Sequence, residues 1–74
     1  DVYKRQVVCL RRPGKRADGF SIWSFRGDEL CAVEAVSDPA GYMLGKTCLE
    51  KRLSPTYDAV TDAAFDMKAF VAAK

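Results

Sequence analysis

Two apolar segments separated by a glycine and an aspartate constrain this chain most. They are Phe20–Arg26 and Glu29–Val36, with Gly27-Asp28 between them. Aromatic and β-branched residues favour extended structure, and a two-residue turn containing glycine favours a hairpin. Both segments carry apolar residues at odd and even positions alike. A hairpin with one face in water alternates apolar and polar residues, so each face of this predicted hairpin needs a cover.

Strict alternation assigns the side chains of the hairpin to its two faces. In the first strand, Trp23 and Phe25 share one face, whereas Phe20 and Ile22 share the other. In the return strand, alternation predicts two sets: Leu30, Ala32, Glu34 and Val36 on one face, and Cys31, Val33 and Ala35 on the other. We expect the following helix to cover one face. The other implies a second helix or contact with something outside this chain.

Ser37-Asp38-Pro39 predicts the start of a helix, because a capping side chain precedes a proline at the first helical position. The helix is expected over residues 39–52. Its predicted apolar stripe has helical spacing and consists of Ala40, Met43, Leu44 and Cys48. Gly41 and Gly45 weaken a helix, so their presence on one side indicates that the backbone of this helix lies close to a neighbour.

The remaining segments are short. An apolar run near residues 6–11 predicts a further strand, and Arg12–Gly19 a loop. Ser54-Pro55 predicts a turn of helix over residues 55–60, and residues 66–72 predict a last helix with Met67, Phe70 and Val71 packed inward. The fold class is therefore α+β: a small antiparallel sheet, made of the hairpin 20–36 and the strand near 6–11, packed against the helix at 39–52 and short C-terminal helical segments.

Composition limits the chemistry. A chain of 74 residues makes one domain, and 49% hydrophobic with 30% charged residues is a globular composition. There is no histidine, so the usual general base is missing. The cysteines, Cys9, Cys31 and Cys48, are widely spaced and lack the pairs typical of zinc sites. We interpret them as reduced core cysteines, and predict no catalytic, cofactor-binding or metal site. No apolar run is long enough to cross a membrane.

Basic residues gather at the start of the first loop. Arg11, Arg12, Lys15 and Arg16 could contact phosphates, but no aromatic side chain interleaves with them and no nucleic-acid-binding motif accompanies them. A solvated loop is the competing interpretation. Residues 1–6 resemble the in-frame translation of a sequencing-library adapter, so we expect them to be a cloning or assembly scar, and the chain, which lacks an initiating methionine, to be a fragment.

The stretch from Phe20 to Lys46 resembles the C-terminal domain of FAD-dependent NAD(P)H:ferredoxin reductases of the putidaredoxin and rubredoxin reductase type. The family pattern there is an aromatic-rich strand, a glycine-containing turn, a strand ending in AVDAVN-x-P and a helix. This chain has AVEAVSDP at residues 32–39, with Glu34 for the usual Asp and Ser37 for the usual Asn. Asp62–Lys68 resembles the closing D-x-x-x-D-L-K segment, with Met67 in place of Leu. Residues 7–74 would be this domain without its first strands.

The resemblance implies a parent with FAD and NAD(P)H domains, which passes electrons from NAD(P)H through FAD to a ferredoxin-type iron–sulfur protein in the cytoplasm. The C-terminal domain would cover the flavin region and help to dock the ferredoxin. Lys46 and Lys68 match basic positions of the family, and we expect them to face the acidic ferredoxin. The partners implied are the missing domains and the ferredoxin, with no nucleic acid and no membrane. FAD and NAD(P)H would belong to the parent, because the flavin-proximal motif lies upstream, and this fragment alone would not be catalytic.

A second hypothesis remains open at this point. The chain could be a free-standing small α+β interaction or nucleic-acid-binding module that uses the basic loop at residues 11–16. Under the first hypothesis the isolated chain should be poorly soluble or marginally stable, since a face meant for another domain would be bare.

Overall fold

The computed structural model describes residues 7–14 and 17–73. Its elements are, in chain order, β1 (Val7–Pro13), β2 (Phe20–Arg26), β3 (Glu29–Val36), α2 (Pro39–Lys51), α3 (Tyr57–Thr61) and α4 (Met67–Ala72). The predicted α+β class is confirmed, and so is the helix at 39–52, whose last residue, Arg52, is its left-handed C-cap. Residues 1–6, interpreted above as a scar, lie outside the described residues.

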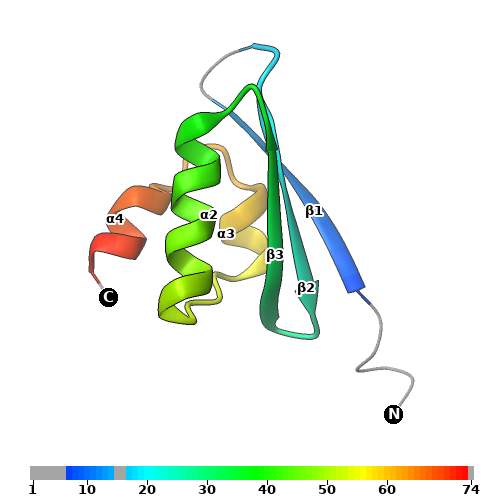
Figure 1. Ribbon diagram of the computed structural model, residues 1–74, viewed down its shortest axis with the longest axis vertical. Helices are drawn as coiled ribbons and strands as arrows, with labels where there is room; N and C mark the ends of the chain where they lie inside the picture. Colours follow the sequence, from blue (N-terminus) through cyan, green and yellow to red (C-terminus); the bar gives the residue numbers. More distant parts are fainter. Residues whose placement is uncertain (1–6, 15–16, 74) are drawn as a thin grey trace.

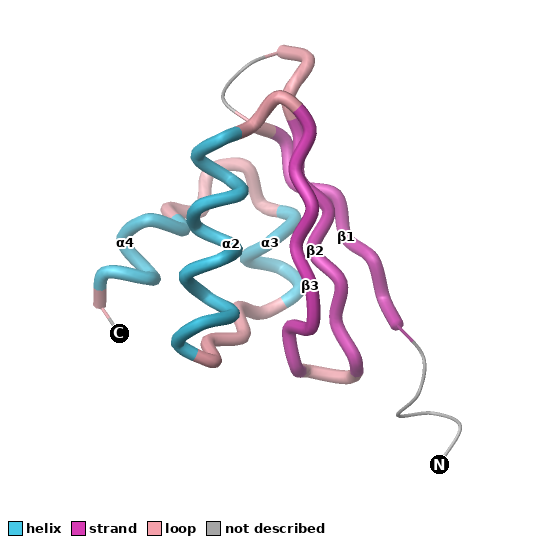
Figure 2. The backbone as a smooth tube through the Cα atoms, in the orientation of Figure 1, coloured by secondary structure: helices cyan, strands magenta, loops and turns pink. Residues whose placement is uncertain are grey.

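The three strands form one antiparallel sheet in the order β1-β2-β3. Leu10 pairs with Trp23, and Trp23 pairs with Val33, which sets the register across the sheet. The three helices lie on the same side of the sheet in Figure 1, and Figure 2 shows the same layering along the backbone. α2 packs on β3 and β2, α3 on β1, and α4 on α2. Among the described residues, no element covers the opposite face, which we call the outer sheet face.

The hairpin follows the prediction up to one irregularity. Gly27 has a φ of +63° in the turn, a conformation that glycine adopts without steric cost. Phe25 pairs with Leu30 but Ser24 pairs with Ala32, so Cys31 is an extra residue in β3. This bulge moves Leu30 to the inner face together with Val33, against the strict alternation expected from the sequence. Leu30 is consequently buried and belongs to the core.

The core lies between the inner face of the sheet and the helices. Its buried residues are Trp23, Phe25, Leu30, Cys48, Val60, Met67 and Val71. The Trp23 indole nitrogen donates to the Ser21 hydroxyl at 2.8 Å, which satisfies the one polar atom that this large side chain buries. Phe25 packs against Tyr57 of α3 with ring centroids 5.0 Å apart. Trp23 and Phe25 share a face as alternation predicts, and the structure shows that this is the face covered by the helices.

α2 begins where its sequence predicts, but it faces the sheet with different residues. Asp38 is the N-cap, and its Oδ1 accepts a hydrogen bond from the Gly41 amide at 3.1 Å. The predicted stripe is wrong at Ala40 and Met43, which are exposed, and Met43 has 57% of its surface open to solvent. Gly45 and Cys48 are the buried residues of this helix, because the small glycine lets α2 lie close to β3.

The two short helices begin close to the predicted positions. α3 begins at Tyr57, two residues after the predicted start, and α4 begins at Met67, one residue after it. Thr56, rather than Ser54, caps α3, and its hydroxyl accepts from the Ala59 amide. The Ser54 hydroxyl instead accepts from the Leu30 amide at 3.0 Å, which ties the segment before α3 to the hairpin. Asp66, expected as the first residue of the last helix, is instead the N-cap of α4. Met67 and Val71 of α4 are buried, and Phe70 is partly buried against the core.

Candidate functional site

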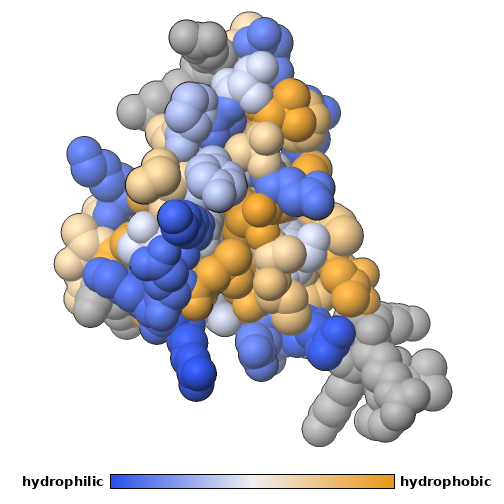
Figure 3. All heavy atoms as spheres, viewed as in Figure 1, coloured by the Kyte–Doolittle hydropathy of each residue, from blue (hydrophilic) through white to orange (hydrophobic). Residues whose placement is uncertain are grey.

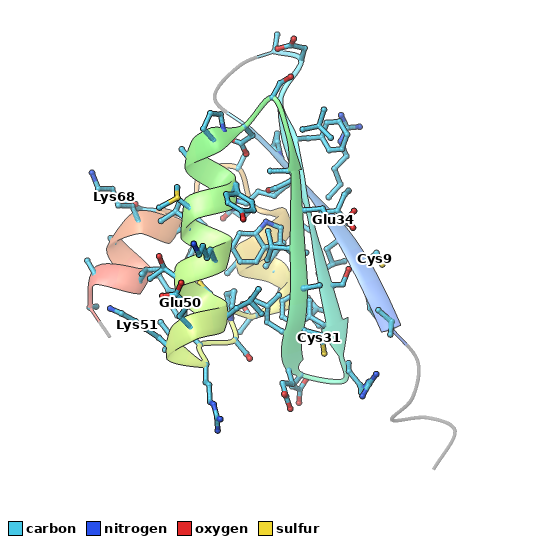
Figure 4. All side chains as sticks on the ribbon, viewed as in Figure 1. Cys9, Cys31, Glu34, Glu50, Lys51 and Lys68 are labelled. Atoms are coloured by element: carbon cyan, nitrogen blue, oxygen red, sulfur yellow. The ribbon has the colours of Figure 1, made fainter. Side chains whose placement is uncertain are left out.

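The two lysines predicted to dock a partner lie on the helical side of the molecule. Lys46 is exposed on α2 and lies away from the buried Cys48 of the same helix. Lys68 is exposed near the start of α4, which packs on α2. Figure 4 shows Lys68 and Lys51 reaching away from the strands, with Glu50 on the same side. The helical side of the molecule therefore presents cations together with exposed carboxylates, which are Glu50, Asp58, Asp62 and Asp66.

The basic cluster at residues 11–16 is divided by the fold. Consecutive strand residues point to opposite faces, so Arg11 and Arg12 of β1 diverge. The Arg12 guanidinium turns inward and donates to the carbonyls of Ala59 at 3.0 Å, Val60 at 3.1 Å, Asp62 at 2.9 Å and Phe65 at 2.6 Å. Arg12 is thereby used within the fold and is not available to a phosphate. Lys15 and Arg16 lie outside the described residues.

Sequence reasoning missed this role of Arg12. The guanidinium satisfies carbonyls at the end of α3, which a helix leaves without partners, and its positive charge suits the negative end of the helix dipole. It also holds α3 and the following loop against β1. The sequence predicted a loop from Arg12 onward, whereas β1 continues through Arg12 to Pro13, and nothing in the sequence indicated which carbonyls the guanidinium would reach.

The outer sheet face combines apolar side chains with the charged side chains of Arg11, Arg26 and Glu34. Its residues, set by strand register and alternation, are Val7, Cys9, Arg11, Pro13, Phe20, Ile22, Ser24, Arg26, Ala32, Glu34 and Val36. The Arg11 guanidinium carbon lies 4.4 Å from the centre of the Phe20 ring, a cation–π contact. In Figure 4, Glu34 and Cys9 point away from the helices. Figure 3 shows hydrophobic atoms along β3 and at its seam with α2.

The cysteines differ from the predicted core set. Cys48 is fully buried, and burial raises the pKa of its thiol above the ordinary value. Cys9 and Cys31 are exposed free thiols, because Cys9 lies on the outer sheet face and Cys31 is the extra residue of the bulge. In the part of the chain that the structure describes, no three of the His, Cys, Asp and Glu side chains gather as metal ligands would. No helix over residues 7–14 and 17–73 has the length and hydrophobicity to cross a membrane.

A shallow groove lies where the hairpin end meets the end of α2. It is lined by Glu29, Leu30, Leu49, Arg52 and Ser54. Its serine hydroxyl is engaged by the Leu30 amide. None of the residues predicted to dock a partner lines this groove, so the groove and the lysines are separate features.

A family model described as Reductase C-terminal matches residues 3–71. The match spans the hairpin, all three helices but for the last residue of α4, and both Lys46 and Lys68. It begins within residues 1–6, whose interpretation as a scar remains a prediction. Neither the curated proteins nor the solved structures include a significant match to the chain.

Proposed function

The chain belongs to the reductase C-terminal family, and on that premise we propose that it is the C-terminal domain of an FAD-dependent NAD(P)H:ferredoxin reductase of the cytoplasm. In such a parent, NAD(P)H reduces FAD, and the flavin passes electrons to a ferredoxin-type iron–sulfur protein. The role of this domain is to cover the flavin region and to help dock the ferredoxin. The family match over residues 3–71 is the observation that carries the proposal.

The glycines among the described residues do not form the phosphate-binding turn of a dinucleotide fold. A dinucleotide fold needs a glycine-rich turn between a strand and a helix. Here Gly41 and Gly45 lie inside α2, beside Asp38 and Val33, and the Gly14 amide donates to the Gly19 carbonyl in the loop between β1 and β2. FAD and NAD(P)H are therefore assigned to the other domains of the parent, and no step of the electron transfer is assigned to this chain.

The outer sheet face supports the existence of further domains. A sheet with helices on one face and a partly apolar second face is typical of a unit that contacts something else. Val7 and Val36 are 52% and 50% exposed at its margins, which is large for valines in strands. In the parent, this face is the surface against which the other domains pack, as the doubly apolar hairpin implies.

Ferredoxin docking is assigned to the opposite, helical side. Ferredoxins are acidic, and positive charges around a docking surface raise the rate of association with an acidic partner. Lys46 and Lys68 are exposed on two helices that pack on one another, and Lys51 lies on the same side. Met43, exposed one helical turn before Lys46, adds an apolar contact of the kind found within protein interfaces.

The test is a double charge reversal, Lys46→Glu with Lys68→Glu, in a parent flavoprotein that carries this domain. We expect kcat/KM for ferredoxin reduction to fall about tenfold at low ionic strength, and the difference from the unmodified protein to shrink as salt is added. NAD(P)H-dependent reduction of a small dye should not change. Unchanged ferredoxin reduction with an unchanged salt response would remove the docking assignment.

A further inference from the structure

The exposed side of α2 carries apolar side chains where a helix in water usually carries polar ones. Among the described residues, three of the five large hydrophobic side chains that are exposed belong to this helix: Tyr42 at 49%, Met43 at 57% and Leu49 at 36%. The other two, Val7 and Val36, lie on the outer sheet face, which is assigned to the other domains of the parent. Single exposed apolar residues are ordinary, whereas a group of them on one helix is typical of a contact surface.

Helical spacing gathers Tyr42, Lys46 and Leu49 into one stripe, which we call the α2 ridge. They stand at i, i+4 and i+7, so they fall within an arc of about 60° around the helix axis. Gly45 is three residues after Tyr42 and four before Leu49, and it lies against Val33 of β3. The ridge therefore borders the seam between α2 and β3, where Figure 3 shows hydrophobic atoms at the surface.

The ridge has a cation between its two apolar side chains. Lys46 is exposed, and an ammonium group that loses its water needs a carboxylate in exchange. This position therefore suits a surface that is open to water in the free protein and is covered by an acidic partner on contact. α2 itself contains one acidic residue, Glu50, which follows Lys46 by one helical turn. Its charge opposes the approach of an acidic partner, so its removal has a predictable sign.

We propose that the α2 ridge is the short-range contact for the ferredoxin, an inference that rests on the proposed function. The acidic partner places a carboxylate against Lys46 and apolar side chains against Tyr42 and Leu49. The two lysines, Lys46 and Lys68, set the rate of encounter, whereas the two apolar side chains set how long the complex lasts. Binding energy concentrates on a few side chains of an interface, and tyrosine is prominent among them. Charge and apolar contact then have different kinetic signatures.

Single truncations in a parent flavoprotein that carries this domain test the ridge. We expect Tyr42→Ala and Leu49→Ala each to raise the KM for ferredoxin at least about fivefold, because each removes contact area from the complex. The salt dependence of kcat/KM should stay that of the unmodified parent, since neither substitution changes a charge. Tyr42→Phe keeps the ring and should retain most of the docking.

Two further variants of α2 serve as controls. Glu50→Gln removes the carboxylate next to Lys46 and should raise kcat/KM for ferredoxin about twofold at low ionic strength, a gain that added salt removes. Thr47→Ala shortens an exposed side chain about 100° around the helix from Lys46, and should leave ferredoxin reduction unchanged. Every variant should retain FAD and reduce a small dye with NAD(P)H as the unmodified parent does, which establishes that its fold is intact.

The outcomes separate the ridge from the proposed function. If Lys46→Glu with Lys68→Glu slows ferredoxin reduction while both truncations leave the KM unchanged, the ridge is overturned and the proposed function stands. Loss of FAD or of dye reduction in both truncations would also overturn it, since the ridge would then pack on the parent's own domains. A Glu50→Gln variant that is slower at low salt would contradict an acidic partner at the ridge. A parent that passes no electrons to a ferredoxin would remove the proposed function itself.

Discussion

Gly45 of α2 lies directly against Val33 of β3: a β-carbon on Gly45 would stand 2.6 Å from the β-carbon of Val33. Side-chain carbons do not approach each other so closely, so the distance between helix and sheet depends on the missing side chain. The glycine suggested close approach in the sequence, and the structure identifies Val33 as the neighbour. This contact sets how tightly α2 covers the core residues Trp23 and Phe25.

Gly45→Ala should destabilise the fold although alanine is the better helix former. The helix gains about 1 kcal/mol from the substitution, whereas forcing a methyl group into a packed interface costs about 1–3 kcal/mol. We expect a net loss of about 1–2 kcal/mol in the free energy of unfolding, measured by urea titration with Trp23 emission. In a chain that also carries Val33→Ala, Gly45→Ala should lower the free energy of unfolding by less than it does beside Val33. A neutral or stabilising Gly45→Ala would mean that the helix moves freely on the sheet.

Arg12→Met should loosen α3 from the sheet. The substitution keeps much of the apolar stem but removes the donors that reach Ala59, Val60, Asp62 and Phe65. Hydrogen bonds from a charged donor contribute about 1.5–3 kcal/mol each, and water replaces part of that at a surface. We expect a loss of about 2–3 kcal/mol in the free energy of unfolding.

Hydrogen exchange should locate the effect of Arg12→Met in residues 57–65. Arg11→Met is the matched control, because the neighbouring side chain lies on the outer sheet face and contacts Phe20. It should cost less than about 1 kcal/mol. Equal losses for the two variants would contradict the inward role of Arg12. A phosphate-binding role would instead show as weaker binding to nucleic acid with stability unchanged.

Thiol reactivity should divide the cysteines by burial. Cys9 and Cys31 are exposed and should react with a maleimide in the folded chain, whereas Cys48 is fully buried and should react only after unfolding. Mass spectrometry of the labelled peptides gives the rates. Fast labelling of Cys48 without denaturant would show that α2 opens readily from the core.

The buried Cys48 thiol should also make stability depend on pH in the alkaline range. Burial raises its pKa above the ordinary value of 9.0, so the unfolded chain loses this proton at a lower pH than the folded chain. Above about pH 9 the unfolded state therefore binds fewer protons, and the free energy of unfolding falls as pH rises. Below that pH the contribution is constant. The comparison is with Cys48→Ala, which should lose less stability over the same range.

Asp38→Ala should weaken the start of α2. Asp38 is 9% exposed as a residue, and its carboxylate accepts a hydrogen bond from the Gly41 amide at 3.1 Å. Loss of an N-cap side chain costs about 0.5–2 kcal/mol, and the buried position of Asp38 favours the upper half of that range. Asp38→Asn, which keeps an acceptor oxygen, should recover part of the loss. Asp66→Ala removes the cap of the much shorter α4 and should cost less than Asp38→Ala in the same thermal or urea unfolding measurement.

Local features account for what the sequence predicted well. Gly27-Asp28 and Asp38-Pro39 are short signals whose effect depends on neighbours a few residues away, so the hairpin turn and the start of α2 are confirmed. The resemblance to reductase C-terminal domains is likewise confirmed by the family match. Ser54 shows where such local signals fail. It is a good capping residue, but its hydroxyl accepts a hydrogen bond from the amide of Leu30, which is distant in the sequence.

The amino-acid sequence by itself determined the α+β class, the hairpin, the main helix and the family, because these depend on local propensity, on periodicity and on the order of motifs. Only the tertiary structure decided the bulge at Cys31, the burial of Gly45 in place of Met43, and the separation of Arg11 from Arg12. Each of these depends on which segments meet in space. A one-residue change of register or a close helix–sheet contact reassigns whole sets of side chains, and the pattern of a single segment does not contain that information.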